Sequence, residues 1–150
     1  MEWFTCKVKY DKTQEDGLIR TVTENYMVDA LSFTEAEETI IKEMEPYMSG
    51  EFVVSDIKRS RIAELFDSDD LTADRWYRVK VGFISIDEKT EKEKVIYQQD
   101  MVLAKSLQEA VEVLDKNMQG TLGDYRIASV TETNILDVFR HDLSQTKEEK

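Results

Sequence analysis

The sequence predicts an α+β protein built from a tandem duplication of one strand–strand–helix–strand (ββαβ) unit. The first observation is an internal repeat, because Trp3 and Trp76 open two similar halves that are 73 positions apart. The most similar pairs of segments are Trp3–Val8 and Trp76–Val81, Met27–Ala36 and Met101–Ala110, and Gly50–Val54 and Gly123–Ile127. A period of this length is too long for a solenoid repeat and fits a duplicated small domain. We therefore expect two lobes related by a pseudo-twofold axis, each with a mostly antiparallel sheet and one main helix.

The second observation is the two-residue alternation of apolar side chains in each half. Phe4, Cys6, Val8 and Tyr10 alternate with polar residues, which predicts a strand with one buried face. Further strands are predicted at 20–29 and 52–59, and their counterparts at 94–103 and 125–132. Because a strand–helix–strand crossover joins parallel strands, the first strand can lie between the other two, in the order 2-1-3.

The third observation is a matched pair of helix starts. Ser32 and Glu35 form a Ser-x-x-Glu capping box, and Ser106 and Glu109 form another at the equivalent place. Apolar residues at helical spacing follow each box, so we predict one amphipathic helix per repeat. Their stripes are Phe33, Ala36, Ile40, Ile41 and Met44 in the first repeat, and Leu107, Ala110, Leu114 and Met118 in the second. Pro46 ends the first helix at the residue before it.

The repeats divide the chain into residues 1–66 and 76–139, with an acidic linker at 67–75 and a tail at 140–150 that we expect to be disordered. Each repeat closes with two apolar residues four positions apart. This spacing predicts a short helical turn folded onto its own lobe. The pairs are Ile62 with Phe66 and Ile135 with Phe139.

Composition restricts the class of protein. The formal net charge is −12, which disfavours direct binding to the phosphates of nucleic acids. It leaves two interpretations open, namely solubility and mimicry of nucleic-acid charge. No apolar stretch is long enough to span a membrane, and the start of the chain lacks the pattern of a secretory signal. The single cysteine cannot form an internal disulfide, so we expect a cytoplasmic protein.

No set of residues predicts catalysis, a cofactor or a metal site. The only histidine, His141, lies in the predicted tail, so we expect no Ser/His/Asp triad and no base for Cys6. Cys6 aligns with Val79, which indicates a packing position. The linker carboxylates at 67–74 lack the glycine of a calcium-binding EF-hand loop, and we interpret them as a solvated linker. The paired glutamates at the helix starts are explained by capping.

One basic cluster is a candidate contact site. It comprises Lys58, Arg59 and Arg61, and the equivalent segment of the second repeat, Thr131–Asn134, carries no positive charge. A solvated strand end would tolerate either composition. The difference between the repeats therefore makes these residues a candidate contact for an acidic partner or a phosphate, and a solvated strand end stays open as the alternative.

Four segments also resemble a known family. They are Trp3–Val8, Val28–Glu37, Gly50–Arg59 and Ala73–Trp76. Together they are similar to a bacterial family of small proteins described only as a domain of unknown function, over Trp3 to Phe139. The resemblance implies a stably folded cytoplasmic protein and carries no activity, cofactor or catalytic residue.

Duplication without catalytic residues favours binding over catalysis. We expect a non-enzymatic protein-interaction module that contacts an unknown protein partner through the lobe interface or an open sheet edge. The alternatives are a small-ligand site in the cleft between the lobes and an acidic mimic of nucleic-acid charge.

Overall fold

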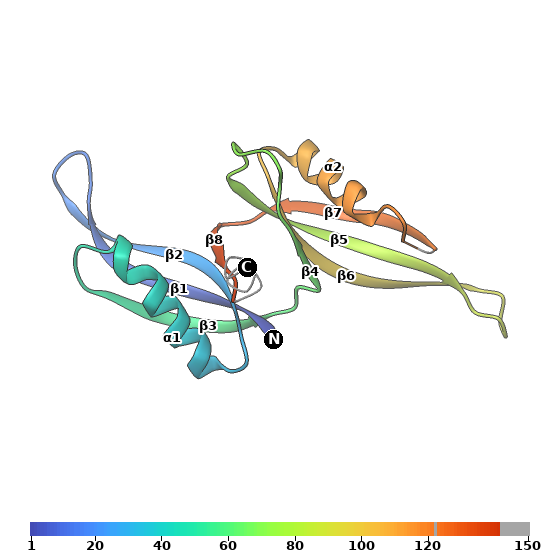
Figure 1. Cartoon of the computed structure of the whole chain (residues 1–150), viewed down its shortest axis with the longest axis horizontal. Coiled ribbons are helices and arrows are strands. Elements are labelled where there is room, and N and C mark those ends of the chain that lie inside the picture. Colours follow the sequence, from blue (N-terminus) through green and yellow to red (C-terminus); the bar gives the residue numbers. More distant parts are fainter. Residues whose placement is uncertain (122, 142–150) are drawn as a thin grey trace, which may run out of the picture. The chain divides into compact units, whose positions relative to one another are not determined.

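The computed structural model describes residues 1–121 and 123–141 of the 150-residue chain. It contains two four-stranded mixed sheets, each with one helix, in a repeated β-β-α-β arrangement, which confirms the predicted α+β duplication (Figure 1). Contacts divide the chain into two compact units. Unit 1 comprises residues 1–60 and 134–150, and unit 2 comprises residues 61–133. The predicted pseudo-twofold relation between the lobes stays a prediction.

Unit 1 is a mixed sheet with α1 across one face (Figure 1). Its strand order is β3-β1-β2-β8, so β1 lies between β2 and β3, as the 2-1-3 order predicts. β1 is antiparallel to both neighbours, whereas β8 is parallel to β2. The elements are β1 (Glu2–Thr13), β2 (Ile19–Ala30), α1 (Phe33–Met44), a short 3₁₀ turn (Glu45–Tyr47), β3 (Phe52–Ser60) and β8 (Ile135–Phe139).

Unit 2 has the same framework, with the strand order β7-β5-β6-β4 and α2 across one face. β5 is antiparallel to β6 and β7, and β4 is parallel to β6. A β-bulge interrupts the outer pair at equivalent places, next to Lys7 in unit 1 and Lys80 in unit 2. The elements are β4 (Glu64–Phe66), β5 (Arg75–Ile86), β6 (Glu93–Ala104), α2 (Leu107–Met118) and β7 (Asp124–Glu132).

The closing segments of the two repeats are exchanged strands, and the prediction of short helices on their own lobes is wrong. β4 closes the first repeat in sequence but pairs with β6 of the second, at Glu64 opposite Asp100. β8 closes the second repeat but pairs with β2 of the first, at Asp137 opposite Tyr26. Each sheet is therefore completed by a strand from the other repeat.

The length of the connections explains the exchange. β3 ends at Ser60, level with Asp29 of β2. To reach the far side of β2 in its own sheet, the next strand would have to move three strand spacings sideways and about three residues back, roughly 17 Å in all. Residues 61–63 allow a reach of only about 14 Å. The chain therefore places its next strand in a different sheet.

Each sheet and its helix enclose a separate apolar core. The core of unit 1 contains Phe4, Cys6, Val8, Tyr26, Val28, Ala30, Ala36, Ile40 and Met44. The core of unit 2 contains Tyr77, Val79, Val81, Val102, Ala104, Ala110, Leu114 and Met118. The exchanged strands contribute Phe139 to the first core and Phe66 to the second. The predicted alternation and the two helix stripes therefore identify most of the buried residues.

Both predicted helix starts are confirmed at their serines. The hydroxyl of Ser32 accepts a hydrogen bond from the N–H of Glu35, and that of Ser106 accepts one from the N–H of Glu109, each over 3.1 Å. The second half of the capping box differs from expectation. A carboxylate oxygen of Glu109 accepts from the N–H of Lys105 at 3.2 Å, one residue before the cap.

Candidate functional site

A groove runs between helix α1 and the outer strand β3 of unit 1. It consists of two adjoining hollows of about 550 and 340 Å³ that share Glu37 and Val54. The helix and the strand run antiparallel beside it, because Arg59 lies over the ring of Phe33 at one end and Glu45 shares a hollow with Glu51 at the other. We call this feature the α1–β3 groove. Its lining residues are Phe33, Thr34, Glu37, Ile41, Glu45 and residues 50–57.

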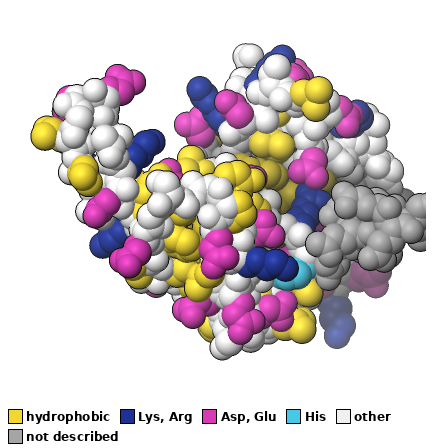
Figure 2. Space-filling model, turned by 60° about the vertical axis from the view of Figure 1, so that its left-hand side comes forward, with side chains coloured by type: hydrophobic (Ala, Val, Ile, Leu, Met, Phe, Trp, Pro, Cys, Tyr) yellow, Lys and Arg dark blue, Asp and Glu magenta, His cyan; other side chains and the backbone are white. Residues whose placement is uncertain are grey.

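The helix wall of the groove alternates apolar and acidic residues. Phe33, Glu37, Ile41 and Glu45 follow one another at four-residue intervals, which places them along one side of α1 and its C-cap. Phe33 is 45% exposed although its ring packs against Phe4 at 5.0 Å between centroids. In Figure 2, acidic side chains lie among and beside hydrophobic ones on the face turned towards the viewer.

The strand wall of the groove is an open sheet edge. β3 is the outermost strand of its sheet, so one side of its backbone faces no neighbouring strand of that sheet. Phe52 and Val54 pack partly against the core, whereas Val53 between them is 61% exposed. These three residues carry no charge. Edge strands commonly carry charged residues that prevent pairing with another chain, so this uncharged stretch remains available for such pairing.

The groove carries an excess of negative charge. Glu37, Glu45 and Glu51 are exposed, and within residues 1–121 and 123–141 none of them forms an ion pair. Asp56 lies 3.8 Å from the ammonium group of Lys58, which partly offsets its charge. The groove therefore offers apolar surface together with three uncompensated carboxylates.

The equivalent place in unit 2 has different chemistry. Tyr125 replaces Phe52, Asp115 replaces Ile41, and the hydroxyl of Tyr125 donates a hydrogen bond to Asp115 over 2.9 Å. This bond links α2 to β7 and raises the pKa of Tyr125. Val111 and Gln119 stand where α1 has Glu37 and Glu45. The helix–strand junction of unit 2 is thus bridged by polar groups and has fewer carboxylates.

The outer strand of unit 2 carries a cation near its start, where β3 has a valine. Arg126 occupies the position of Val53 and donates a hydrogen bond to the hydroxyl of Tyr97 over 2.9 Å. The ring of Tyr97 in turn lies 4.6 Å from the ammonium group of Lys80. A cation anchored on an edge strand hinders strand addition. β7 therefore carries an anchored cation at the position where β3 has the exposed Val53.

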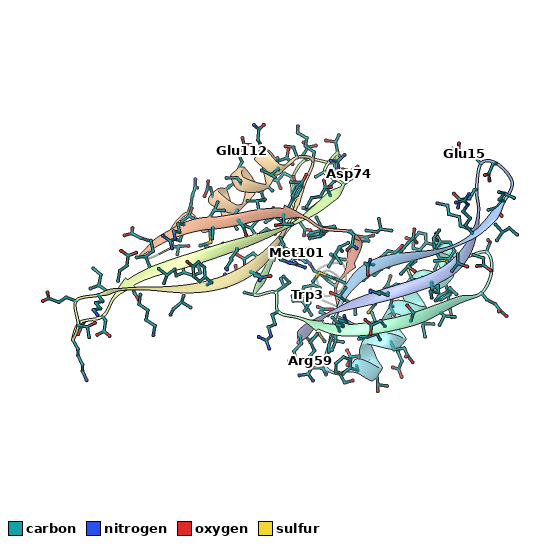
Figure 3. The ribbon with its side chains drawn as sticks, turned by 180° about the vertical axis from the view of Figure 1, so that it is seen from behind. Trp3, Glu15, Arg59, Asp74, Met101 and Glu112 are labelled. Atoms are coloured by element: carbon teal, nitrogen blue, oxygen red, sulfur yellow. The ribbon has the colours of Figure 1, made fainter. Side chains whose placement is uncertain are left out.

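The structure separates the three residues of the predicted basic cluster. Lys58 pairs with Asp56. The guanidinium group of Arg59 lies 5.3 Å from the centre of the Phe33 ring, on the helix side of the sheet, and 3.7 Å from Glu2 (Figure 3). Neighbouring residues of a strand point to opposite faces, so Lys58 lies on the other side. Arg61 follows the strand and is exposed. Their contact with an acidic partner stays a prediction.

The first residues of the predicted tail are ordered, which corrects the expectation for Arg140 and His141. The backbone N–H of His141 donates to a carboxylate oxygen of Asp29 over 2.7 Å, and its Nδ1 lies 2.8 Å from the same oxygen. Nε2 lies 3.5 Å from the hydroxyl of Thr39 and 3.9 Å from Glu35. These contacts anchor the end of β8 to the end of β2 and to α1. Residues 142–150 lie outside the described residues.

The hydroxyl, imidazole and carboxylate of Thr39, His141 and Asp29 follow the order of a nucleophile–base–acid relay. However, the 3.5 Å separation between Thr39 and His141 is at the outer limit of a hydrogen bond. Thr39 also lies in the middle of α1, and it does not line the α1–β3 groove. Ser68, which occupies the position of His141 in the other repeat, donates to Glu109 over 3.3 Å. His141 and Ser68 each link the residues after an exchanged strand to a helix, His141 to Glu35 and Thr39 of α1 and Ser68 to Glu109 of α2, and this role explains the geometry.

The remaining reactive groups are buried or engaged. Burial raises the pKa of the Cys6 thiol to about 12, so it is not a nucleophile at neutral pH. Asp100 is fully buried, where both of its carboxylate oxygens accept from the amide of Gln98, and burial raises its pKa. Among the described residues no group of three or more His, Cys, Asp and Glu side chains is arranged to hold a metal ion.

Two of the linker carboxylates form surface ion pairs with lysines just before and within α2. Asp70 accepts hydrogen bonds from Thr72 and lies 3.2 Å from Lys105, and these contacts lower its pKa to about 2. Asp69 lies 3.2 Å from Lys116 at the other end of the helix. The linker is therefore part of unit 2.

Sequence reasoning missed the α1–β3 groove because it assigned Phe33 and Ile41 to the core. A usable signal was present in the repeat, since Ile41 aligns with Asp115 and a core position rarely accepts a carboxylate. An apolar residue aligned with a charged one indicates a position at the surface.

Neither helix in the described part of the chain is long and apolar enough to cross a membrane. Comparison with curated proteins gave no match, and comparison with solved structures gave none. A family model does match residues 2–141, which is nearly all of the described chain. By this match, which agrees with the resemblance seen in the sequence, the chain belongs to the family described as Domain of unknown function (DUF4494).

Proposed function

We propose that the protein is a non-enzymatic interaction module that binds an extended segment of a partner protein in the α1–β3 groove. The observation that carries this proposal is an open strand edge with an uncharged stretch, residues 52–54, beside a groove of apolar and acidic residues. A partner segment that adds to β3 as a fifth strand would pair with the outward backbone groups, and its side chains would fill the groove. Other peptide-binding domains use strand addition in this way.

The comparison between the units supports the choice of this edge. β7 occupies the same place in unit 2, but Arg126 and the bond between Tyr125 and Asp115 occupy the corresponding surfaces. Packing of the unit therefore does not require an open groove. The proposal keeps the cytoplasmic location predicted from the sequence. The predicted ligand site between the lobes and the charge mimicry stay predictions.

The decisive experiment transplants the closed junction of unit 2 into unit 1. The double variant I41D/F52Y places the Asp115–Tyr125 pair between α1 and β3, in a framework where unit 2 already accommodates it. We expect the tagged wild-type protein to capture a stoichiometric partner from an extract of its native cells, and I41D/F52Y to lose it. The matched control D115I/Y125F changes the same pair in unit 2 and is expected to retain the partner.

A second measurement locates the contact. Addition of the captured partner is expected to slow hydrogen exchange at the amides of β3 and to leave those of β7 unchanged. Equal capture by wild type and I41D/F52Y, or protection confined to other strands, would contradict the proposal. Absence of any partner specific to the wild type would contradict it as well.

A further inference from the structure

The α1–β3 groove has a repeating chemical pattern that specifies its occupant. Along α1 the wall reads aromatic, acidic, aliphatic, acidic at Phe33, Glu37, Ile41 and Glu45. Four residues of an α-helix advance about 6 Å, and two residues of an extended strand advance about 6.7 Å. Over three such steps the difference is only about 2 Å. Every second side chain of an added strand would therefore meet one member of this series.

We propose that the groove selects a cationic extended segment in which alternate residues face α1, and in which these facing residues alternate between apolar and Lys or Arg. The apolar residues would lie against Phe33 and Ile41, and the cationic residues would lie beside Glu37 and Glu45. This inference rests on the proposed strand addition at β3 and deepens it by naming the chemistry of the partner.

Charge complementarity favours a cationic occupant over a neutral one. Glu37, Glu45 and Glu51 lie around the groove without cationic partners among the described residues, and the whole chain has a net charge of −12. The long stems of Lys and Arg can cover apolar surface while their charged ends reach a carboxylate. An anionic segment would bring like charges together, which opposes binding.

The second unit shows that the pattern is specific to α1. The corresponding side of α2 reads Leu107, Val111, Asp115 and Gln119, and its one carboxylate already accepts a hydrogen bond from Tyr125. The two apolar positions are adjacent, so alternation with acidic residues is absent. The same fold therefore forms without the acidic series, and packing of the unit does not require it.

Synthetic peptides test this pattern on the full-length protein. The matched peptide, Lys-Thr-Val-Thr-Lys-Thr-Val-Thr-Lys, has the same order in both directions and places Lys and Val on one face. The charge-reversed peptide replaces Lys with Glu. The isomer Thr-Lys-Val-Lys-Thr-Lys-Val-Thr-Thr has the same composition as the matched peptide, but its Lys and Val lie on opposite faces of a strand.

Fluorescence anisotropy with labelled peptides gives the dissociation constants. We expect the matched peptide to bind about tenfold or more tightly than either other peptide, with an advantage over the Glu peptide that shrinks as salt is added. The charge-swap variant E37K/E45K is expected to prefer the Glu peptide. The control E38K/E112K makes the same change of charge at exposed helix positions that do not line the groove, one of them labelled in Figure 3, and is expected to keep the wild-type preference.

The outcomes separate this inference from the proposed function. Equal binding of the three peptides, or an unchanged preference in E37K/E45K, would overturn the charge and spacing pattern and leave strand addition at β3 in place. If no peptide binds and the captured partner still protects β3 from exchange, the pattern is likewise overturned. If the partner protects other strands, both the pattern and the proposed function are overturned.

Discussion

Unit 1 leaves a hollow between its helix and its outer strand where unit 2 forms a hydrogen bond. The two units share strand order, bulge position and helix caps, so their frameworks need the same internal contacts. They differ at Ile41 and Phe52 against Asp115 and Tyr125, all on the outer helix–strand junction. The two copies of the unit therefore act as controls for each other. Residues and contacts that both units share are explained by the fold. Those that only unit 1 has are not required by the fold and are candidates for binding.

Cutting the chain into fragments is expected to reveal the largest difference in stability between the two units. Residues 61–133 contain α2 and all four strands of the second sheet, whereas residues 1–66 lack β8 and leave one edge of β2 without its partner. We expect the fragment 61–133 to melt cooperatively and the fragment 1–66 to lack a cooperative transition, as measured by circular dichroism. A cooperative melt of 1–66 would show that β8 is dispensable.

Removal of one aromatic ring from an exchanged strand tests the same dependence in the intact chain. The ring of Phe139 stacks on Tyr26 at 5.8 Å between centroids and packs against the first core. Phe139→Ala should cost about 2 kcal/mol, because the residue is half-buried. Hydrogen exchange is expected to accelerate in residues 1–60, far away in sequence. Phe66→Ala should accelerate it in residues 67–133 instead, and the reverse pattern would contradict the exchange.

A buried carboxyl distinguishes the two sheets at one position. Asp100 occupies the place of Tyr26, and burial raises its pKa above the value of 3.8 expected in the unfolded chain. The folded state then binds the proton more tightly. The contribution of the Asp100 carboxyl to the free energy of unfolding is therefore largest below about pH 4. It falls as the pH rises from there to the pKa of the group in the folded state.

Asp100→Asn is expected to raise the free energy of unfolding at neutral pH and to lose this advantage in acid. Urea denaturation at several pH values measures the free energy of unfolding of each variant. Tyr26→Phe is the matched variant at the equivalent position of unit 1, where it removes the hydrogen bond that Tyr26 donates to Glu24 over 3.0 Å. We expect it to cost about 1 kcal/mol near neutral pH. A gain in Asp100→Asn that is equal at pH 3 and pH 7 would contradict the assignment.

The smallest effect concerns the hairpin loops. Gly17 has a φ of +83° in the first hairpin, and Glu91 has a φ of +58° in the second. The left-handed conformation costs a non-glycine residue about 1–2 kcal/mol, and glycine avoids this cost. Glycine, however, loses about 0.5–1 kcal/mol more conformational entropy on folding, which offsets part of the gain. Glu91→Gly should therefore stabilise the protein by about 0.5 kcal/mol in thermal melts, whereas Gly17→Ala should destabilise it. A loss of stability in Glu91→Gly would contradict the assigned strain.

Local patterns in the sequence predict local structure well here. The alternation from Phe4 to Tyr10 and the cap at Ser32 specify a strand and a helix start through neighbours in sequence, and both predictions are confirmed. The spacing of Ile62 and Phe66 was misleading because residues four apart share a face in a helix and also in a strand. The choice of partner sheet depends on how far residues 61–63 can reach, which no periodicity encodes.

The candidate site was less predictable for a related reason. Lys58 and Arg59 are adjacent in sequence, but a strand sends them to opposite faces, so a cluster in the sequence is not a cluster on the surface. Conversely, Glu37 and Glu51 belong to separate elements and line one hollow only after α1 has packed beside β3. The site was thus visible only as a difference between the repeats.

The exchange of closing strands has a consequence for the order of folding during synthesis. Domains generally fold as units from the N-terminus while the chain is being made. Here residues 61–133 are complete once Thr133 has been added, but the sheet that contains residue 2 still lacks β8. The unit translated first is therefore the last to close. Until then the edge of β2 that receives β8 is exposed on the nascent chain, and β8 covers it only after the whole second sheet has been made.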